Sequence, residues 1–310
     1  MKTLVLGAGA IGGYVGGRLH QSGADVTFLV RDKRNEALKR DGLVIKSTKG
    51  DIIQTVKTVT KASDGGPYDI VLLTCKAYDL DSAIDAIAPA IGAGTTIVPL
   101  LNGMRHIDVL AAKFGDAKVV GGLARVGVAM NDKGEILHTS PFAAISFGER
   151  DGKPARPALV ALDAAIKKSG VDGGLNANIV QDLWDKWIML CTLAATCCLM
   201  RGASGDVLEA DEGQAIVLET VDEGRKVAAA AGHDPGEKGI ATIRSFLTVK
   251  GSKFTASMLH DLEKGAMVEA DHVVGDMIAR AKKAGIAAPN LRMAYAHLQV
   301  YLALRARKQA

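Results

Sequence analysis

The chain opens on Leu4-Val5-Leu6-Gly7-Ala8-Gly9-Ala10-Ile11-Gly12, an apolar run followed by the spacing G-x-G-x-x-G. The apolar run is typical of a buried strand, and the residues after Gly12 are compatible with a helix. In that context Gly7 permits a tight turn, Gly9 lets the backbone approach a pyrophosphate, and Gly12 lets helix and strand pack closely. Unpaired N–H groups at the helix start would hold the phosphates. We therefore expect Gly7, Ala8, Gly9, Ala10, Ile11 and Gly12 to bind a dinucleotide; the alternative is a glycine-rich turn that binds nothing.

The end of the second expected strand, Phe28-Leu29-Val30-Arg31-Asp32, bears on which dinucleotide binds. An enzyme that uses NAD usually has an acidic residue here for the ribose 2′-hydroxyl, whereas one that uses NADP has an arginine for the 2′-phosphate. Arg31 comes first and Arg34 is close, so we expect NADP, with NADPH as its reduced form. Asp32 leaves NAD open, and a solvent-exposed surface role is the alternative for Arg31.

Composition and charge narrow the class of protein. The 310 residues are 48% hydrophobic and 23% charged, which is ordinary for a soluble globular protein of two domains, and the formal net charge of +4 is low for nucleic-acid binding. The most apolar run, 187–200, is shorter than the ~20 residues of a spanning helix, so we expect a core helix and no membrane association. Cys191, Cys197 and Cys198 in that run, with Cys75 after an apolar strand, indicate free thiols and a cytoplasmic protein.

Strands alternate with helices in the first half of the chain. Apolar runs at 3–6, 25–30, 70–74 and 96–100 are separated by helix-length segments, which predicts a parallel sheet with right-handed crossovers. Residues 43–59 predict a strand pair that turns at 49–51. Residues 119–130, 136–138 and 143–147 predict antiparallel strands added to one side of the sheet. With a helix over 155–168 and a short strand near Val171, we expect residues 1–177 to form a Rossmann-type dinucleotide-binding domain of the α/β class.

Helical periodicity replaces the strand signal after residue 178. Helices are predicted over 180–200, 206–231, 237–248, 256–283 and 290–307, with breaks at segments that contain glycine or proline. We therefore expect residues 178–310 to form an all-helical domain that carries the substrate and the catalytic residues. The apolar and aromatic positions of 293–304 either cover the core or join a homodimer.

Several kinds of oxidoreductase are excluded by what the sequence lacks. It has no Tyr-x-x-x-Lys pair of the short-chain dehydrogenases. Its seven histidines and four cysteines show no zinc-ligand spacing, so we expect no metal. The glycine motif also lacks the Lys-Ser/Thr ending of a phosphate loop, which argues against nucleotide hydrolysis. Reduction of a ketone builds negative charge on its oxygen, which a positioned cation or acid must meet. Lys186, at the start of an otherwise apolar helix, meets that need. The alternative is an interface lysine paired with Asp182 or Asp185.

The order of several motifs resembles the ketopantoate reductase (2-dehydropantoate 2-reductase) family over nearly the full length. The matching segments are the glycine motif, Arg31, Thr74-Cys75-Lys76-Ala77-Tyr78, Leu101-Asn102-Gly103-Met104, Trp184-Asp185-Lys186, Ser257-Met258-Leu259-His260-Asp261 and Glu269. Each segment is modest by itself, but their order and spacing together are specific. The resemblance implies an NADPH-dependent reductase of a small 2-oxo acid, acting in pantothenate biosynthesis by hydride transfer to the 2-keto carbon.

The resemblance also implies two catalytic residues and their neighbours. Lys186 would be the general acid that protonates the substrate carbonyl oxygen, and Glu269 would lie near the nicotinamide ribose and orient the lysine. Asn102 would contact both cofactor and substrate, and Ser257 would bind the substrate. The residues alone leave simpler roles open: a helix-surface carboxylate for Glu269, a cap between strand and helix for Asn102, and a helix N-cap for Ser257.

Two further residues enter through the resemblance as contacts of the cofactor. Lys76 would lie along it, with a solvated loop lysine as the alternative. Gly127 stands where the family has another backbone contact, on a looser alignment.

The expected substrate wall departs from the family. Where the family has asparagines four and eight residues after the lysine, this chain has Leu190 and Ala194; Ser204 stands for a third asparagine, and Val274-Gly275 replaces Asn-Gly. Losing amides removes hydrogen bonds to a hydroxylated substrate and makes the wall apolar. Ketopantoate is the expected substrate. The alternatives are a less polar 2-oxo acid or an opine-like keto compound, and, as a lesser one, a non-catalytic NADPH-binding sensor.

Overall fold

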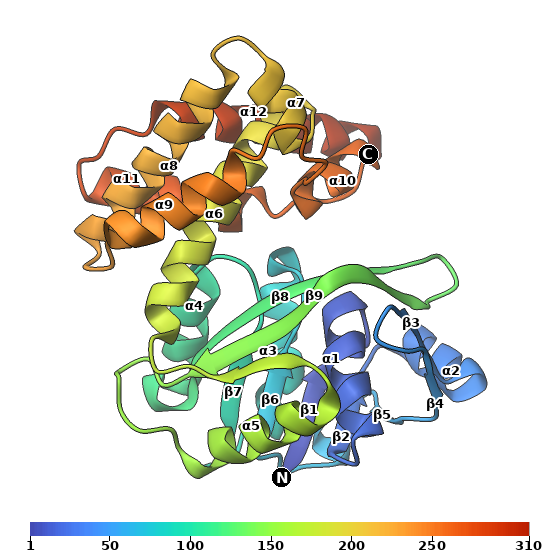
Figure 1. The fold of residues 1–310 in the computed structure, drawn as a ribbon. Coiled ribbons are helices and arrows are strands. Elements are labelled where there is room, and N and C mark those ends of the chain that lie inside the picture. The colour runs from blue at the N-terminus through green and yellow to red at the C-terminus, as the bar shows by residue number, and fades with distance from the viewer. Residues whose placement is uncertain (310) are drawn as a thin grey trace. The chain divides into compact units, whose positions relative to one another are not determined.

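The computed structural model describes residues 1–309, and these form two units (Figure 1). The first unit comprises Met1–Leu101 and His106–Val180. The second comprises the short segment Asn102–Arg105 and the chain from Gln181 onward. The boundary expected between residues 177 and 178 lies just before this division, whereas the separate grouping of Asn102–Arg105 has no counterpart in the sequence pattern.

Five parallel strands form the first sheet of the first unit. Their order is β5-β2-β1-β6-β7, with bounds Lys57–Val59 (β5), Asp25–Leu29 (β2), Lys2–Leu6 (β1), Ile70–Leu73 (β6) and Thr96–Pro99 (β7). Helices follow β1, β2 and β6, so each strand can return in the same direction. The α/β class with a parallel, Rossmann-type sheet is confirmed.

A second sheet contains the strands that we expected at one side of the first. Its order is β10-β9-β3-β4 with β8 paired to β9, and the bounds are Asp172–Leu175 (β10), Ile136–Gly148 (β9), Leu43–Ser47 (β3), Ile52–Gln54 (β4) and Gly121–Met130 (β8). The expected antiparallel pairing is confirmed between β8 and β9, with Arg125 opposite Ala144. Addition to the first sheet is wrong, because β9 is one continuous strand that pairs in parallel with β3, Ile45 opposite Ile136. The strand pair β3–β4 is confirmed, but β5 leaves it to join β2.

Helix α1 (Ala10–Gln21) packs against both sheets, and its glycines allow this (Figure 1). A Cβ on Gly16 would lie 2.7 Å from the ring of Phe28 in β2, and one on Gly17 would lie 2.7 Å from Ile45 in β3. Phe28 and Ile45 are fully buried in one apolar core that includes residues of both sheets. Small residues on two faces of one helix therefore let it serve both sheets.

The other elements of this unit are the helices α2 (Asp32–Asp41), α3 (Leu80–Ile87), α4 (Arg105–Phe114) and α5 (Pro157–Ser169), and the short 3₁₀ turns η1 (Ala62–Asp64), η2 (Ala77–Asp79), η3 (Ala88–Ala90) and η4 (Asp116–Lys118). Arg156, just before α5, donates from Nε and Nη2 to the two carboxylate oxygens of Glu149, at 2.7 and 2.5 Å. This pair ties the end of β9 to the start of α5.

The regular elements of the second unit are all helical within its described residues. Its elements are α6 (Ile179–Met200), which begins in the first unit, α7 (Ser204–Glu209), α8 (Gly213–Ala230), α9 (Gly236–Leu247), α10 (Ser257–Glu263), a π-helical turn η5 (Asp271–Gly275), α11 (Asp276–Lys283) and α12 (Pro289–Gln309). The all-helical domain is confirmed, but single helices over 206–231 and 256–283 are wrong. Glu212, with φ of 63°, separates α7 from α8, and Gly265, with φ of 68°, follows the end of α10.

Helix α6 is the core helix of its unit. Trp187, Ile188 and Cys191 are at most 1% exposed. By length and hydropathy alone α6 could cross a membrane, yet 67% of its most apolar window is buried within the protein, as in the core helix of a soluble protein. The expected free thiols are confirmed, since no disulfide joins the four cysteines, and the three in α6 are buried.

Candidate active site

The glycine loop between β1 and α1 has the shape that a bound pyrophosphate requires. Gly7 has a φ of 88°, and its N–H donates to the carbonyl oxygen of Leu29 at 2.9 Å. A side chain on Gly9 would meet no atom within 4 Å, so the loop is open there, whereas one on Gly12 would collide with the carbonyl oxygen of Gly7. No side chain caps the start of α1, and its first turn has no acidic residue. Its first N–H groups are therefore suited to an anion, which fits a dinucleotide.

Two arginines lie near this loop in different ways. Arg34 in α2 donates from Nε to the carbonyl oxygen of Ala8 at 3.1 Å, and burial lowers its pKa. Arg31 precedes α2 with a side chain 82% exposed, and its Nη2 lies 3.4 Å from Oδ1 of Asp79. Such an exposed pair contributes less than about 1 kcal/mol, so a phosphate can replace the carboxylate. Asp32 is exposed in the first turn of α2, where the helix dipole stabilises a carboxylate.

The other two expected cofactor contacts also lie in the first unit. Lys76 is half-buried just before η2, in a segment that Thr74 ties to the glycine loop by donating from Oγ1 to the carbonyl oxygen of Leu6 at 2.7 Å. Gly127 is exposed at an irregularity in the β8–β9 pairing, where any side chain would collide with that of Ser140. The contact with Ser140 therefore explains a glycine at position 127 without any cofactor.

Lys186 and Asn102 form a hydrogen-bonded pair in the second unit. Lys186 lies on α6 next to the buried Trp187, and its Nζ donates to Oδ1 of Asn102 at 3.0 Å. Asn102 follows β7 in the chain but belongs to the Asn102–Arg105 segment of the helical unit. Two residues expected to contact the substrate, far apart in the sequence, are thus in direct contact.

A small pocket borders Asn102 within the same unit. Its lining residues are Asn102, Leu190, Ala194, Ala256, Ser257, Met258, Glu269 and Val273, five of which the sequence predicted. The cavity volume is about 10 Å³, room for about one water molecule. A keto acid therefore needs side chains of the wall to move, and Leu190 and Met258 are long enough to do so.

Three expected residues have clear positions around this pocket. Glu269 is 8% exposed in the irregular segment before η5, so a surface carboxylate is the wrong interpretation. Ser257 is the first residue of α10 and Ala256 is its N-cap, so the cap role for Ser257 is also wrong. Ser204 starts α7, is buried, and donates its N–H to the carbonyl oxygen of Phe254 at 2.9 Å. It does not line the pocket.

Family models described as "Ketopantoate reductase PanE/ApbA" and "Ketopantoate reductase PanE/ApbA C terminal" match residues 3–152 and 178–302. The chain belongs to the ketopantoate reductase family. It is 37% identical over 305 residues to YkpB of Bacillus subtilis, an uncharacterized oxidoreductase, covering 97% of this chain and 99% of the relative. The protein is therefore an oxidoreductase.

Solved structures share the fold over the whole length. The crystal structure of 2-dehydropantoate 2-reductase from Methylococcus capsulatus has a TM-score of 0.88 at 29% identity, covering 98% of this chain and 97% of that one. A structure of D-mandelate dehydrogenase with NADH and anilino(oxo)acetate has a TM-score of 0.87 at 22% identity, covering 99% and 100%. The second likeness concerns the fold alone.

Three residues that line the pocket were not predicted from the sequence: Ala256, Met258 and Val273. Met258 lies in a segment that carries the family resemblance, so that segment was the available signal. Val273 lies in the π-helical turn, which α-helical periodicity does not describe. Within residues 1–309 no group of three His, Cys, Asp or Glu side chains is placed to hold a metal ion.

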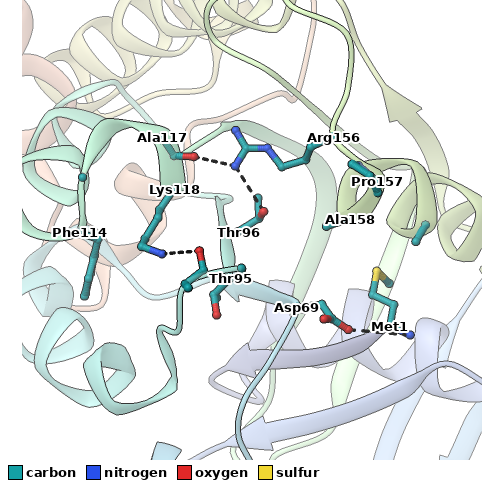
Figure 2. A pocket seen from close by; sticks show the side chains of 14 residues that line it. Met1, Asp69, Thr95, Thr96, Phe114, Ala117, Lys118, Arg156, Pro157 and Ala158 are labelled. Carbon is teal, nitrogen blue, oxygen red and sulfur yellow. Dashed lines mark hydrogen bonds and ion pairs between the residues drawn. The ribbon is translucent and has the colours of Figure 1, made fainter.

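A larger hollow of about 710 Å³ lies at the amino-terminal ends of β1, β6 and β7 (Figure 2). The basic side chains that line it, Lys118 and Arg156, are hydrogen-bonded to backbone carbonyl oxygens. Lys118 donates from Nζ to the carbonyl oxygens of Gly92 and Ala93, and Arg156 donates from Nη1 to that of Ala117. Ligands of open parallel sheets bind at the carboxyl ends of the strands. None of the expected site residues lines this hollow.

Proposed function

We propose that the chain is an NADPH-dependent 2-dehydropantoate 2-reductase, which converts ketopantoate and NADPH to pantoate and NADP. The observation that carries the proposal is the 3.0 Å hydrogen bond from Lys186 to Asn102, beside a pocket that Asn102, Ser257 and Glu269 line. A proton donor thus lies next to polar groups that can hold a keto acid, in a pocket whose other lining residues are apolar.

The proposed chemistry adds one hydride and one proton across the keto group. Reduced nicotinamide, when bound, supplies the hydride to C2. The Lys186 ammonium meets the charge that develops on the keto oxygen and gives it a proton, which leaves a 2-hydroxy acid. An ammonium has three N–H donors, and one of them is directed at Asn102. Ser257 donates to the substrate, and the buried carboxyl of Glu269 orients the lysine.

NADPH as the cofactor is supported by the arginines near the glycine loop. Arg31 is exposed and weakly paired, which suits a residue that exchanges Asp79 for a 2′-phosphate. The same fold holds NADH in D-mandelate dehydrogenase, so the fold does not choose between the two dinucleotides. The choice rests on side chains such as Arg31, with Gly7, Ala8, Gly9, Ala10, Ile11 and Gly12 binding the phosphates common to both, and Lys76 and Gly127 as further contacts.

A second candidate substrate is a less polar 2-oxo acid. Leu190 and Ala194 line the pocket together with Ala256, Met258 and Val273. An apolar wall cannot reward a substrate hydroxyl with a hydrogen bond, so discrimination in favour of ketopantoate would be lost. A branched aliphatic side chain would fill such a wall better.

NADPH oxidation at 340 nm tests both candidates. Ketopantoate, 2-oxoisovalerate and pyruvate are compared with wild type, Lys186→Ala and the exposed-lysine control Lys250→Ala. Fast turnover of ketopantoate that falls by about 10²-fold or more in Lys186→Ala, and not in the control, supports the first proposal. A preference for 2-oxoisovalerate replaces it with the second. Full activity of Lys186→Ala contradicts the mechanism.

We also propose that the protein is cytoplasmic and forms a homodimer. Four free thiols support a cytoplasmic location. On α12 the side chains of Met293, Val300 and Leu304 are 63%, 58% and 50% exposed at helical spacing, which supports a homodimer through that helix. Sedimentation equilibrium of wild type and Val300→Glu tests this; a monomeric wild type contradicts it.

A further inference from the structure

His272 packs against the turn that carries Asn102 and does not itself line the pocket. It is the second residue of the π-helical turn η5, is 5% exposed, and stands between the pocket-lining residues Glu269 and Val273 in the sequence. π-helical turns are rare and often occur at functional sites. No motif drew attention to this residue.

On one side His272 holds the turn that carries Asn102. Its imidazole hydrogen-bonds the backbone of Asn102. The next residue, Gly103, has a φ of 78°, and a Cβ there would lie 3.0 Å from the carbonyl oxygen of His272 and 3.1 Å from its Cδ2. The backbone of the Asn102–Gly103 turn therefore packs directly on this histidine.

On the other side the same π-helical turn is fixed to α6 beside Lys186. The indole Nε1 of Trp187 donates to the carbonyl oxygen of Val273 at 2.9 Å. Both ends of the Lys186–Asn102 hydrogen bond are thereby joined to η5, one through Trp187 and the other through His272. The contacts form a closed ring, so a change at His272 alters the position of the Asn102 carboxamide relative to the ammonium.

His272 is suited to holding a structure and unsuited to proton transfer at neutral pH. Burial lowers its pKa to about 4, with smaller effects of Arg105 and Arg280 in the same direction, while Asp276 acts in the opposite one. The ring is therefore neutral above pH 6, with one donor and one acceptor nitrogen.

We propose that His272 is a positioning residue, which fixes the Asn102–Gly103 turn so that the Asn102 carboxamide holds the Lys186 ammonium at the substrate carbonyl. The inference rests on the proposed role of Lys186 as proton donor. It predicts that His272 acts on the chemical step through Lys186 and Asn102, and not on cofactor binding.

The first experiment replaces His272 by an apolar ring and by a polar side chain. In His272→Phe, kcat falls by about 10–100-fold with little change in KM for the keto acid or Kd for NADPH. His272→Gln, whose amide nitrogen can donate in place of the imidazole, recovers most of the loss. His138→Phe is a matched control, since His138 is also buried but lies in the first unit, bonded to Ser47. It leaves kcat of the folded enzyme unchanged.

A double-mutant cycle separates positioning from a general structural effect. In the Lys186→Met background, His272→Phe has no further effect on the residual rate if His272 acts through the lysine. An additive loss in the cycle, or an unchanged kcat in His272→Phe, overturns the inference.

An activity-independent readout keeps the inference testable if no tested keto acid is reduced. In ¹⁵N-asparagine-labelled protein the Asn102 carboxamide signal, assigned with Asn102→Asp, shifts in His272→Phe and in Lys186→Met but not in His138→Phe. An unmoved Asn102 signal in folded His272→Phe contradicts the positioning role whatever the substrate is.

Discussion

Arg31 and Arg34 are near neighbours in sequence, yet they are placed for different tasks. Arg34 is half-buried and bonded to the glycine loop through the carbonyl of Ala8, whereas Arg31 is exposed and lies close to Asp79. Arg31→Ala is expected to weaken NADPH binding by about 10–100-fold, the loss of charge-assisted hydrogen bonds to a phosphate, and to leave NADH binding unchanged. Arg34→Ala is expected to weaken both, because it loosens the loop that both cofactors share.

Dissociation constants of NADPH and NADH, measured by fluorescence titration of the two variants and wild type, check this division. If Arg31→Ala weakens NADPH and NADH binding equally, Arg31 supports the glycine loop. The contact with the ribose 2′ position then belongs to Asp32 or Arg34.

Leu190 and Ala194 give a second prediction at the scale of single side chains. Leu190→Asn with Ala194→Asn places two amides in the apolar wall and is expected to raise kcat/KM for ketopantoate relative to 2-oxoisovalerate by about 10-fold or more. Ala194 is 1% exposed, so the variant also loses about 1–3 kcal/mol of stability if its amide finds no partner. Substrate competition assays measure the ratio, with Leu190→Ala as the size control; an unchanged ratio shows that this wall does not select the substrate.

The sequence could predict the residues that act in the site better than those that hold them. Lys186 stood out because a lysine in an apolar helix needs a partner, and the resemblance supplied Glu269 and Asn102. His272 and Trp187 had no such signal, because a backbone hydrogen bond and a π-helical turn depend on contacts between distant segments. The bond between Lys186 and Asn102 likewise follows from tertiary structure alone.

Helix α1 shows at the scale of elements how one short segment serves both binding and folding. Gly9 at its start faces open space, while Gly16 in its middle faces Phe28. Gly9→Ala is expected to keep the stability of wild type and to weaken binding of either cofactor, because its methyl group occupies the space that a pyrophosphate approaches. Gly16→Ala is expected to cost about 1–3 kcal/mol by overpacking, which exceeds the roughly 1 kcal/mol that alanine gains in a helix.

Urea unfolding and cofactor titration of the two variants separate these effects. Loss of stability in Gly9→Ala, or wild-type stability in Gly16→Ala, contradicts the assignment of one glycine to the ligand and the other to the core.

The strands of the two sheets differ in how far the sequence could predict them. Strand and helix positions around β1, β2, β6 and β7 followed from hydrophobic periodicity, because parallel strands buried on both faces leave continuous apolar runs. The second sheet was missed because its parallel pairing of β3 with β9 joins strands far apart in the chain. Periodicity predicts that a strand exists and does not identify its partner.

At the scale of the molecule, the two tryptophans of the chain make the helical unit observable by itself. Trp184 and Trp187 both lie on α6 and are buried in that unit, so their fluorescence reports its unfolding and not that of the sheets. Acid acts on both units, and burial lowers the pKa of His138 in the first unit as it lowers that of His272 in the second. In the first, hydrogen bonds from Arg156 and Lys167 lower the pKa of Glu149 and of Asp163, so their contribution is lost only as the pH falls below the ordinary carboxyl range.

In the helical unit an acid response above the carboxyl range is expected from His272. Its pKa is about 4 in the folded protein and about 6.5 in the unfolded chain, so unfolding takes up a proton between these values. The stability due to its neutral form is complete above pH 6.5 and falls as the pH decreases towards 4, by a total on the order of 3 kcal/mol. Glu223 acts in the opposite direction, since burial raises its pKa, so the test compares variants and not absolute slopes.

Urea midpoints followed by tryptophan fluorescence at pH 7.5 and pH 5 are therefore expected to differ more in wild type than in His272→Gln, which has no titrating ring. Arg105, Arg280 and Asp276 are unchanged in that variant, so their charges affect both proteins alike. If the two proteins lose equal stability between these pH values, His272 is accessible to protons in the folded state, and its neutral ring does not hold the Asn102 turn.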